Sequence, residues 1–415
     1  MPSLMIDFSD IYGQASRGPN GNVNGGTIAL SSAVMAKLLP LILVYKQNIL
    51  ANELGVYNIS DNVVNGTAYW TSQEGIEYIT TARPSNCSRT AITDYSVTNL
   101  SKALSKNHVF MEFCADAQLA ELDAIWKPLW GTANDLNDAL NSEGGKLFLK
   151  KFVEKAANGM ANDFTSITEF GNHQIITDVL AANPLSLAAG IVTRATATFG
   201  TADGRLKQVD ALMTGSYPHI NNAFAGGDTD GHIFTGDALG YAEELATLAN
   251  ADFGGAMDAM RSQYMYPVCE CSAGVFNKLK KDILAAYPNL ASSLSYKMNG
   301  TLAAEMGIEL QNLVRPDALV WDGIVFVARY DWDKTAKKLG FYHHRMLLSV
   351  PQNFGIAIDV PNTGINNFPD MGMVVQKTAD LSKGGKYELE ANYQLAVKPL
   401  QTNYIVNRSL TTLTA

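Results

Sequence analysis

The stretch MYPVCECSAGVFNKLKKDIL, residues 265–284, predicts a short strand followed directly by a helix. The apolar residues before Ser272 suit a strand, and Ser272 is a natural N-cap for the helix. The helix is amphipathic, because three apolar side chains share one of its faces: Phe276, Leu279 and Ile283. We therefore expect this strand and helix to pack into the core of the fold.

Two cysteines close the predicted strand, and they raise the question of a metal or redox site. Cys269 and Cys271 leave the same side of a strand with α-carbons roughly 6.6 Å apart, near the limit for a disulfide. A zinc site would need Cys87 and Cys114 to converge on them, and neither has the paired spacing of a zinc ligand. We expect two small buried side chains without metal.

The composition indicates a globular chain of two or three domains. It has 415 residues, 47% hydrophobic and 17% charged, and can bury a large core. The net charge of -9 argues against sequence-independent binding to the phosphates of nucleic acid. Asp7 and Asp10 precede any basic residue, so we expect no secretory signal and reduced cysteines.

Polar residues and a proline interrupt the most apolar stretch, Ile28–Tyr45, which predicts a buried or interfacial helix rather than a membrane span.

The first third of the chain reads as an arm, a helix and a hairpin. Residues 1–26 are rich in Gly, Asn and Ser and predict a flexible arm. Pro40 to Gly55 has one apolar stripe and suits a helix. From residue 56 to about 106 the character is β, and Asn65-Gly66 is a strong hairpin signal. The strand NHVFMEFC, residues 107–114, and a helix from Ala115 to about Pro128 follow.

The clearest periodic segment is KLFLKKFVEKAANGMANDF, from residue 146, which predicts a long helix ending by Gly171. Residues 200–237 are rich in Gly, Asp and Asn and predict a surface loop with little regular structure. Two helices, 238–249 and 255–263, lead to the opening stretch. The last hundred residues predict mainly strands, at 323–330, 343–350, 354–360, 387–397 and 402–410. Mixed elements without regular βαβ alternation favour an α+β fold.

A second group of polar residues, DWDKTAKKLGFYHHR, holds Asp331, Asp333, His343 and His344. Adjacent histidines on a strand point to opposite faces and make poor co-ligands. The two aspartates suit a polar turn between strands. We therefore expect no metal site here.

Other motifs also fail their templates. GDTDGH, residues 227–232, begins like a calcium loop, but its twelfth position is Leu239 instead of Glu. No phosphate-binding loop and no G-x-S-x-G motif occur. The sequence thus predicts no catalytic residue, no cofactor-binding residue and no metal ligand.

The order of elements resembles the major capsid proteins of tailed bacteriophages with the HK97-type fold. The resemblance rests on the arm, the hairpin, the strand HVFMEFC, the long helix ending at FGN, and the strand and capped helix of YPVCECSAGVFNKLKKDI. It covers most of residues 107–409, while residues 174–237 match nothing specific. It implies an α+β, HK97-like capsid fold with these regions: N-terminal arm (1–26), N-terminal helix (27–55), extended β-hairpin loop (56–106), peripheral domain with a spine helix and a loop-rich insertion (107–240), axial-like domain (241–360) and C-terminal strands returning to the peripheral domain (361–415).

The resemblance also implies a function. It predicts a non-enzymatic subunit that assembles with itself, as hexameric and pentameric capsomers, into a shell around phage double-stranded DNA. Portal, scaffold or decoration proteins would be its other partners, with no membrane, and its location would be the virion capsid, assembled in the host cytoplasm. Two alternatives stay open: an encapsulin-like shell that encloses enzymes, and a hydrolase with a dispersed site.

Overall fold

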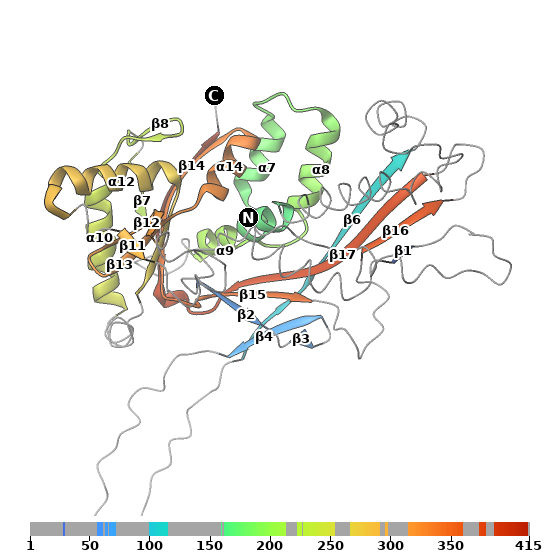
Figure 1. The fold of residues 1–415 in the computed structure, drawn as a ribbon, viewed down its shortest axis with the longest axis horizontal. Coiled ribbons are helices and arrows are strands. Elements are labelled where there is room, and N and C mark those ends of the chain that lie inside the picture. Colours follow the sequence, from blue (N-terminus) through green and yellow to red (C-terminus); the bar gives the residue numbers. More distant parts are fainter. Residues whose placement is uncertain are drawn as a thin grey trace, which may run out of the picture. The chain divides into compact units, whose positions relative to one another are not determined.

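Strand β10 (Val268–Cys271) lies in the middle of a seven-stranded sheet of the computed structural model. The fold is drawn in Figure 1. The structure describes residues 28–29, 56–60, 63–64, 66–71, 99–114, 159, 162–212, 222–225, 227–253, 266–290, 295–297, 314–359, 373–378 and 386–413. Helices and strands are mixed, so the predicted α+β class is confirmed.

The chain divides into two compact units. The first consists of Met1–Gln47, Ser105–Thr165 and Ile358–Leu395, and the second of Asn48–Leu104, Ser166–Ala357 and Ala396–Ala415. The predicted region boundaries at residues 106, 240 and 360 stay predictions.

The first unit is built on a long antiparallel ladder. Strand β6 (Ser105–Cys114) pairs with β17 (Lys386–Pro399) from Ser105↔Leu395 to Cys114↔Lys386. Strand β16 (Met373–Thr378) pairs with β17, and β1 (Ile28–Ala29) pairs with β16. The strands expected at 107–114 and 387–397 are thus present. The expectation of a helix from Ile28 is wrong at its start, because Ile28 and Ala29 pair their backbone with β16 instead.

The seven-stranded sheet of the second unit has the order β11-β12-β13-β10-β14-β18-β7. Its other strands are β11 (Ser295–Lys297), β12 (Val314–Trp321), β13 (Ile324–Ala328), β14 (Phe341–Ser349), β18 (Ile405–Leu413) and β7 (Asn222–Ala223). Asp322 and Gly323, with φ of 47° and 73°, make the tight turn between β12 and β13. The strands predicted at 323–330, 343–350 and 402–410 therefore belong to one sheet.

One face of this sheet carries the apolar core. Helices α10 (Ala238–Asp252) and α12 (Ala273–Ala286) pack there, and Cys269 and Cys271 are fully buried among their side chains. The two sulfur atoms lie 3.8 Å apart, as expected for side chains on one face. Burial raises the pKa of the Cys269 thiol well above its usual range, so this thiol stays protonated. Both cysteines are core residues, as the sequence predicted.

Replacing Cys269 and Cys271 together by Ala is expected to lower the free energy of unfolding by about 1–2 kcal/mol, because it leaves a small cavity. Urea denaturation measures the difference. A much larger loss, or stoichiometric zinc in the native protein, would contradict a purely apolar role.

A small sheet forms the base of the predicted hairpin. Strands β3 (Val63–Val64), β4 (Thr67–Thr71) and β5 (Asn99–Ala103) pair antiparallel, and Val64 lies opposite Thr67. Gly66 has a φ of 71°, which explains the Asn-Gly signal. Trp70 of β4 packs on Gly355. A Cβ atom added to Gly355 would lie 2.5 Å from the Trp70 indole, so a glycine is needed for this contact. The hairpin base is thus fixed to β15 (Phe354–Asp359), which pairs with β2 (Tyr57–Ser60).

The second unit contains further helices and short strands. Residues 162–170 are helical and the chain turns at Gly171, as predicted. The further elements are α7 (Gln174–Ala182), α8 (Ala189–Phe199), α9 (Arg205–Leu212), α14 (Tyr330–Leu339), the short strands β8 (Thr229–Asp230) and β9 (Ile233–Phe234), and the 3-10 turns Pro288–Leu290 and Thr402–Tyr404.

Two predictions about this unit are wrong. Residues 200–237 are not simply a loop, because α9 forms there with Leu206 and Val209 buried one turn apart. Asp331 and Asp333 do not lie in a turn between strands. They occupy the first turn of α14, where carboxylates favour the positive end of the helix dipole, and Gly340 ends that helix with a φ of 86°.

Several predicted elements lie outside the described residues. They are the arm at 1–26, the helices at 40–55, 115–128 and 255–263, the first part of the long helix at 146–158, and Cys87.

Candidate functional site

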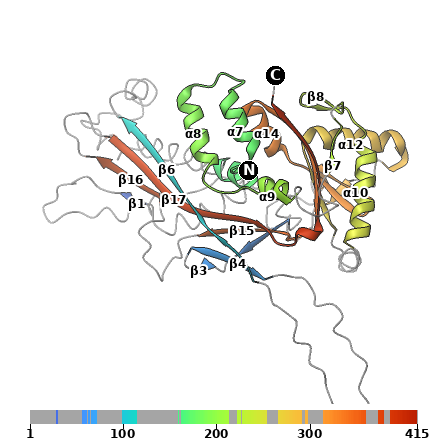
Figure 2. The same cartoon turned by 180° about the vertical axis from the view of Figure 1, so that it is seen from behind.

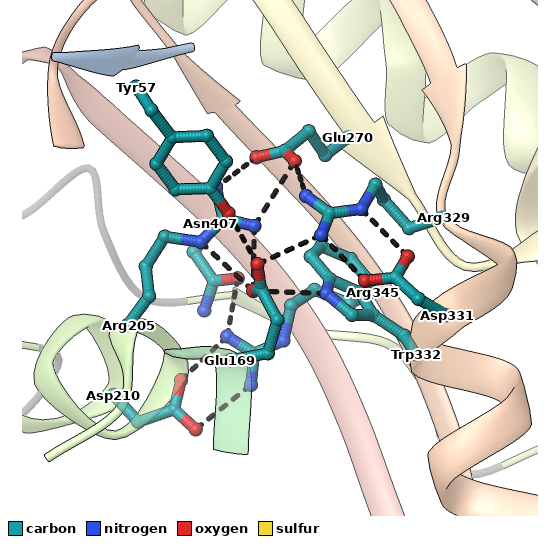
Figure 3. A network of polar contacts seen from close by, with 10 residues as sticks. All are labelled: Tyr57, Glu169, Arg205, Asp210, Glu270, Arg329, Asp331, Trp332, Arg345 and Asn407. Carbon is teal, nitrogen blue, oxygen red and sulfur yellow. Dashed lines mark hydrogen bonds and ion pairs between the residues drawn. The ribbon is translucent and has the colours of Figure 1, made fainter. Parts of the chain in front are cut away.

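The face of the seven-stranded sheet opposite the cysteines carries charges. Glu270 lies between Cys269 and Cys271 on β10, so its side chain leaves the other face. There it meets three further charged residues, drawn in Figure 3: Glu169, Arg205 and Arg329. All four side chains are at most 2% exposed. We call these four residues the buried ionic network.

Each residue of the network comes from a different element of the second unit. Glu169 lies near the end of the helical residues 162–170, and Arg205 is the first residue of α9. Glu270 belongs to β10, and Arg329 lies between β13 and α14. The network therefore ties two helices to strand β10 and to the junction of β13 and α14.

Both carboxylates bridge both guanidinium groups. Glu169 Oε2 accepts hydrogen bonds from Arg205 Nε at 3.0 Å and Nη2 at 2.8 Å, and Glu169 Oε1 accepts one from Arg329 Nη2 at 2.8 Å. Glu270 Oε1 accepts from Arg205 Nη2 at 3.1 Å and also contacts Arg329, while its Oε2 contacts Arg205 Nη1. Two positive and two negative charges thus compensate each other inside the protein.

Neutral donors complete the hydrogen bonding of Glu169. Trp332 Nε1 donates to its Oε2 at 3.1 Å, and the Tyr57 hydroxyl donates to its Oε1. Tyr57 belongs to β2, just ahead of the hairpin strands. Asp331 accepts two hydrogen bonds from Arg329, at 2.9 and 2.7 Å, from the rim of the network. Figure 3 shows these side chains turned toward one another.

Aromatic rings enclose the guanidinium groups. The Arg205 guanidinium carbon lies 5.0 Å from the ring centroid of Tyr57 and 4.8 Å from that of Phe354, and Arg329 lies 5.1 Å from that of Trp332. These are cation–π distances, and the rings also keep water out.

The network holds permanent charges. Burial raises the pKa of Glu169, but Arg205 and Arg329 outweigh it and lower this pKa to about 2. Burial raises the pKa of Tyr57, so its hydroxyl stays a neutral donor. Glu169 and Tyr57 therefore do not exchange protons near neutral pH, and the arrangement suits mechanical cross-bracing.

A second ion pair continues along the same face of the sheet. Arg345 of β14 donates to Asp210 of α9 at 2.8 and 2.9 Å and to Asn407 of β18 at 3.1 Å. His173 Nε2 contacts Asp210 at 2.8 Å, while its Nδ1 accepts from the Ile175 N–H and caps α7. Burial opposes ionisation of Asp210, but Arg345 holds its pKa well below the usual range. Helices α7 and α9 are thus also held to the sheet.

The predicted candidate residues do not join these networks, apart from Asp331. His343 Nδ1 contacts Thr411 at 3.2 Å and His344 Nε2 donates to Gly231 O at 2.8 Å, so the adjacent histidines serve different partners. Burial lowers the pKa of His343 well below its usual range. Ser272 holds the N-cap position, but its hydroxyl accepts from the Arg345 N–H instead of capping the helix.

Sequence reasoning missed the buried ionic network. One signal was available, because Glu270 is a charged residue on an otherwise apolar strand and a buried carboxylate requires a partner. The partners are 36 to 160 positions from Glu169 and follow no spacing rule.

A surface pocket lies at the N-terminal end of α12. It has a volume of about 310 Å³ and is lined by His232, Ile233, Phe234, Ala273, Gly274, Asn277, Lys278, Lys281 and Asp333. Asp333 Oδ2 accepts from the Ala273 N–H at 2.7 Å and so caps α12. Burial and the neighbouring Asp331 raise the pKa of Asp333 to about 6.

This raised pKa predicts a pH dependence. Because the folded-state pKa of Asp333 lies above the ordinary value of 3.8, the folded protein binds this proton more tightly than the unfolded chain. Asp333 thus makes the free energy of unfolding rise as the pH falls from about 7 toward 4. Asp333→Asn keeps the capping oxygen and should flatten this rise, as measured by urea denaturation across that pH range. An unchanged slope would contradict the assignment.

Among the residues that the structure describes, no group of three or more His, Cys, Asp or Glu side chains could hold a metal ion. In the same residues, no helix has both the length and the apolar character needed to cross a membrane.

No protein-family model matches the chain, and neither does any curated protein. Solved structures that it resembles include the procapsid of satellite phage P4, with 9% identity and a TM-score of 0.45 over 90% of this chain and 89% of that one. The capsid of Ralstonia phage GP4 has 11% identity and a TM-score of 0.40 over 88% and 89%. An encapsulin complex from Synechococcus elongatus has 9% identity and a TM-score of 0.32 over 85% and 84%.

Proposed function

We propose that the chain is a structural subunit with an HK97-type fold that assembles with itself into an icosahedral capsid around phage double-stranded DNA. The observation that carries this proposal is the hairpin base. Strands β4 and β5 pair from Thr67↔Ala103 to Thr71↔Asn99, so the two residues that flank 72–98 lie opposite each other. Two paired strands with a long connection between them resemble the base of the extended loop by which shell subunits of this family reach their neighbours.

The anchoring of this base supports the proposal. Trp70 donates to Asn58 O at 3.4 Å and is 4% exposed, and Lys398 donates to Ser101 O at 3.2 Å. Leu104 N–H donates to Gly66 O at 2.9 Å, which closes the small sheet. A fixed base suits a contact with a neighbouring subunit, because less conformational freedom is then lost on binding.

The buried ionic network also suits a shell wall. Assembly loads each subunit mechanically, and a unit whose helices and strands are cross-braced by charged hydrogen bonds resists deformation. The acidic balance of -9 limits adhesion of the wall to packaged DNA. On this proposal the chain is no enzyme, its location is the virion capsid assembled in the host cytoplasm, and its further partners are portal, scaffold or decoration proteins.

The test is assembly of the purified chain. Sedimentation and electron microscopy are expected to reveal large closed particles with icosahedral symmetry, and particles from infected cells should protect DNA from nuclease. Particles that enclose protein and no DNA would favour the encapsulin-like alternative. A chain that stays monomeric under every assembly condition would overturn the proposal and favour the alternative of a hydrolase with a dispersed site.

A further inference from the structure

Helix α8 is exposed along nearly its whole length but carries almost no charge. Its last residue, Phe199, is buried, and residues 189–198 are exposed or partly exposed. Over residues 181–198, Arg194 is the single charged side chain, whereas 17% of the whole chain is charged. Figures 1 and 2 both show α8 running beside α7. An exposed helix normally turns charged residues outward, so this composition requires an explanation.

The surface of α8 is more apolar than its threonines suggest. The hydroxyl groups of Thr193 and Thr196 donate to the carbonyls of Ala189 and Val192, at 3.0 and 2.9 Å, one turn back along the helix. These hydroxyls are therefore satisfied within the helix. Leu185, in the loop before α8, and Ile191 are 47% and 41% exposed. An exposed surface with few charges and protruding apolar side chains is a candidate for protein contact.

We propose that this surface, formed by Leu185 and the outer side of α8 and called here the α8 face, docks against the α8 face of a second copy of the chain. The proposal deepens the proposed function and rests on it, because a shell requires contacts between copies. Charge favours a second copy as the occupant. Two copies of a chain with net charge -9 repel each other, but residues 181–198 contain no carboxylate and one arginine, Arg194, so this repulsion between negative charges is weakest here.

The shape of the α8 face fits a symmetric contact. A Cβ atom built on Gly190 would meet nothing within 4 Å, and Thr193 and Ala197 follow on the same side of the helix. These small residues let another helix approach closely, while Leu185 and Ile191 protrude at one end. A two-fold axis would place the protruding side chains of one copy on the small residues of the other.

The size of the contact predicts how it acts. A helix of this length spans about 16 Å, and one such contact buries less than the roughly 1,000 Å² of a stable interface. A single α8 contact therefore does not hold a dimer in solution. Repeated around a closed shell, many weak contacts add up, so the effect should be seen in assembly.

The experiment compares assembly of Ile191→Asp with Thr177→Asp in the full chain. Both positions are exposed and both changes add one negative charge, but Thr177 lies on α7. Light scattering measures the protein concentration at which particles form. We expect Ile191→Asp to raise this concentration by about tenfold or more, with Thr177→Asp close to the parent. Circular dichroism and thermal melting verify that both variants are folded.

Two further variants keep the test decisive. Gly190→Leu adds bulk into open space, so it should spare folding and impair assembly even if Ile191→Asp fails to fold. An equal mixture of Ile191→Asp and Ile191→Lys chains should assemble better than either alone, because the two faces then attract each other. If the parent assembles and Ile191→Asp and Gly190→Leu assemble equally well, the α8 contact is wrong and the proposed function stands. If the parent never assembles, the proposed function fails and the α8 contact with it.

Discussion

Replacing Glu270 by Gln should lower the free energy of unfolding by about 3–5 kcal/mol, because it leaves a buried positive charge uncompensated. Glu270 is 1% exposed and contacts both Arg205 and Arg329. Without its charge, Glu169 alone faces two guanidinium groups inside the network, with Asp331 at the rim. Urea denaturation followed by circular dichroism measures the change. Against a typical total stability of about 5–15 kcal/mol, such a loss is large enough to unfold part of the population at physiological temperature.

The matched control is Asp203→Asn, which also converts a paired acid to its amide. Asp203 binds Lys207 at 2.7 Å, but its side chain is 34% exposed, so water screens this pair. A change of at most about 1 kcal/mol is expected there. Equal losses for the two variants would contradict the claim that burial gives the network its weight.

Replacing the whole network should act differently from breaking it. When every charge of a buried cluster is exchanged for apolar side chains of similar volume, stability is often unchanged or increased. The network is therefore weak support for high stability as such. What it gives this unit is a defined arrangement, because Glu169 and Glu270 find all their donors in one relative placement of the helices and strands.

Local patterns were sufficient to predict the core of the fold from sequence. Strand β10, helix α12 and the turn at Gly66 were predicted within a few residues, since each depends on side-chain periodicity or on one glycine with positive φ. Helix α9 and the first turn of α14 were missed for a common reason. Glycine, aspartate and asparagine neighbours suggested loops, whereas buried contacts of Arg205 and Trp332 with distant residues stabilise helices there.

The face of the sheet that carries the charges was beyond such reasoning. The alternation in VCEC places Glu270 opposite the cysteines, and that much follows from the period of a strand. The partners of Glu270 depend on the strand order β13-β10-β14 and on where α9 and residues 162–170 pack. No local sequence pattern encodes the strand order or this packing. The α8 face was hidden for a related reason, because exposure of an apolar helix is a tertiary property.

The prediction with the largest expected effect concerns residues 72–98. We would replace Ser72–Thr98 by a short Gly/Ser linker and keep β4 and β5, so that Trp70 still packs on Gly355. Loop closure should tolerate the shorter connection, because its entropy changes only slowly with length. The melt should therefore remain cooperative and close to that of the parent.

Assembly of this variant should be lost, because the deleted residues are expected to make their contacts with a neighbouring subunit. Under conditions in which the parent forms closed particles, sedimentation should find the variant as monomers or small capsomers. A linker of the original length with Gly/Ser composition is the matched control for chain connectivity, and it should fail in the same way because it lacks the contact side chains. Particles of unchanged size from either variant would exclude residues 72–98 as an intersubunit contact, and the hairpin would then be only a loop on its own subunit.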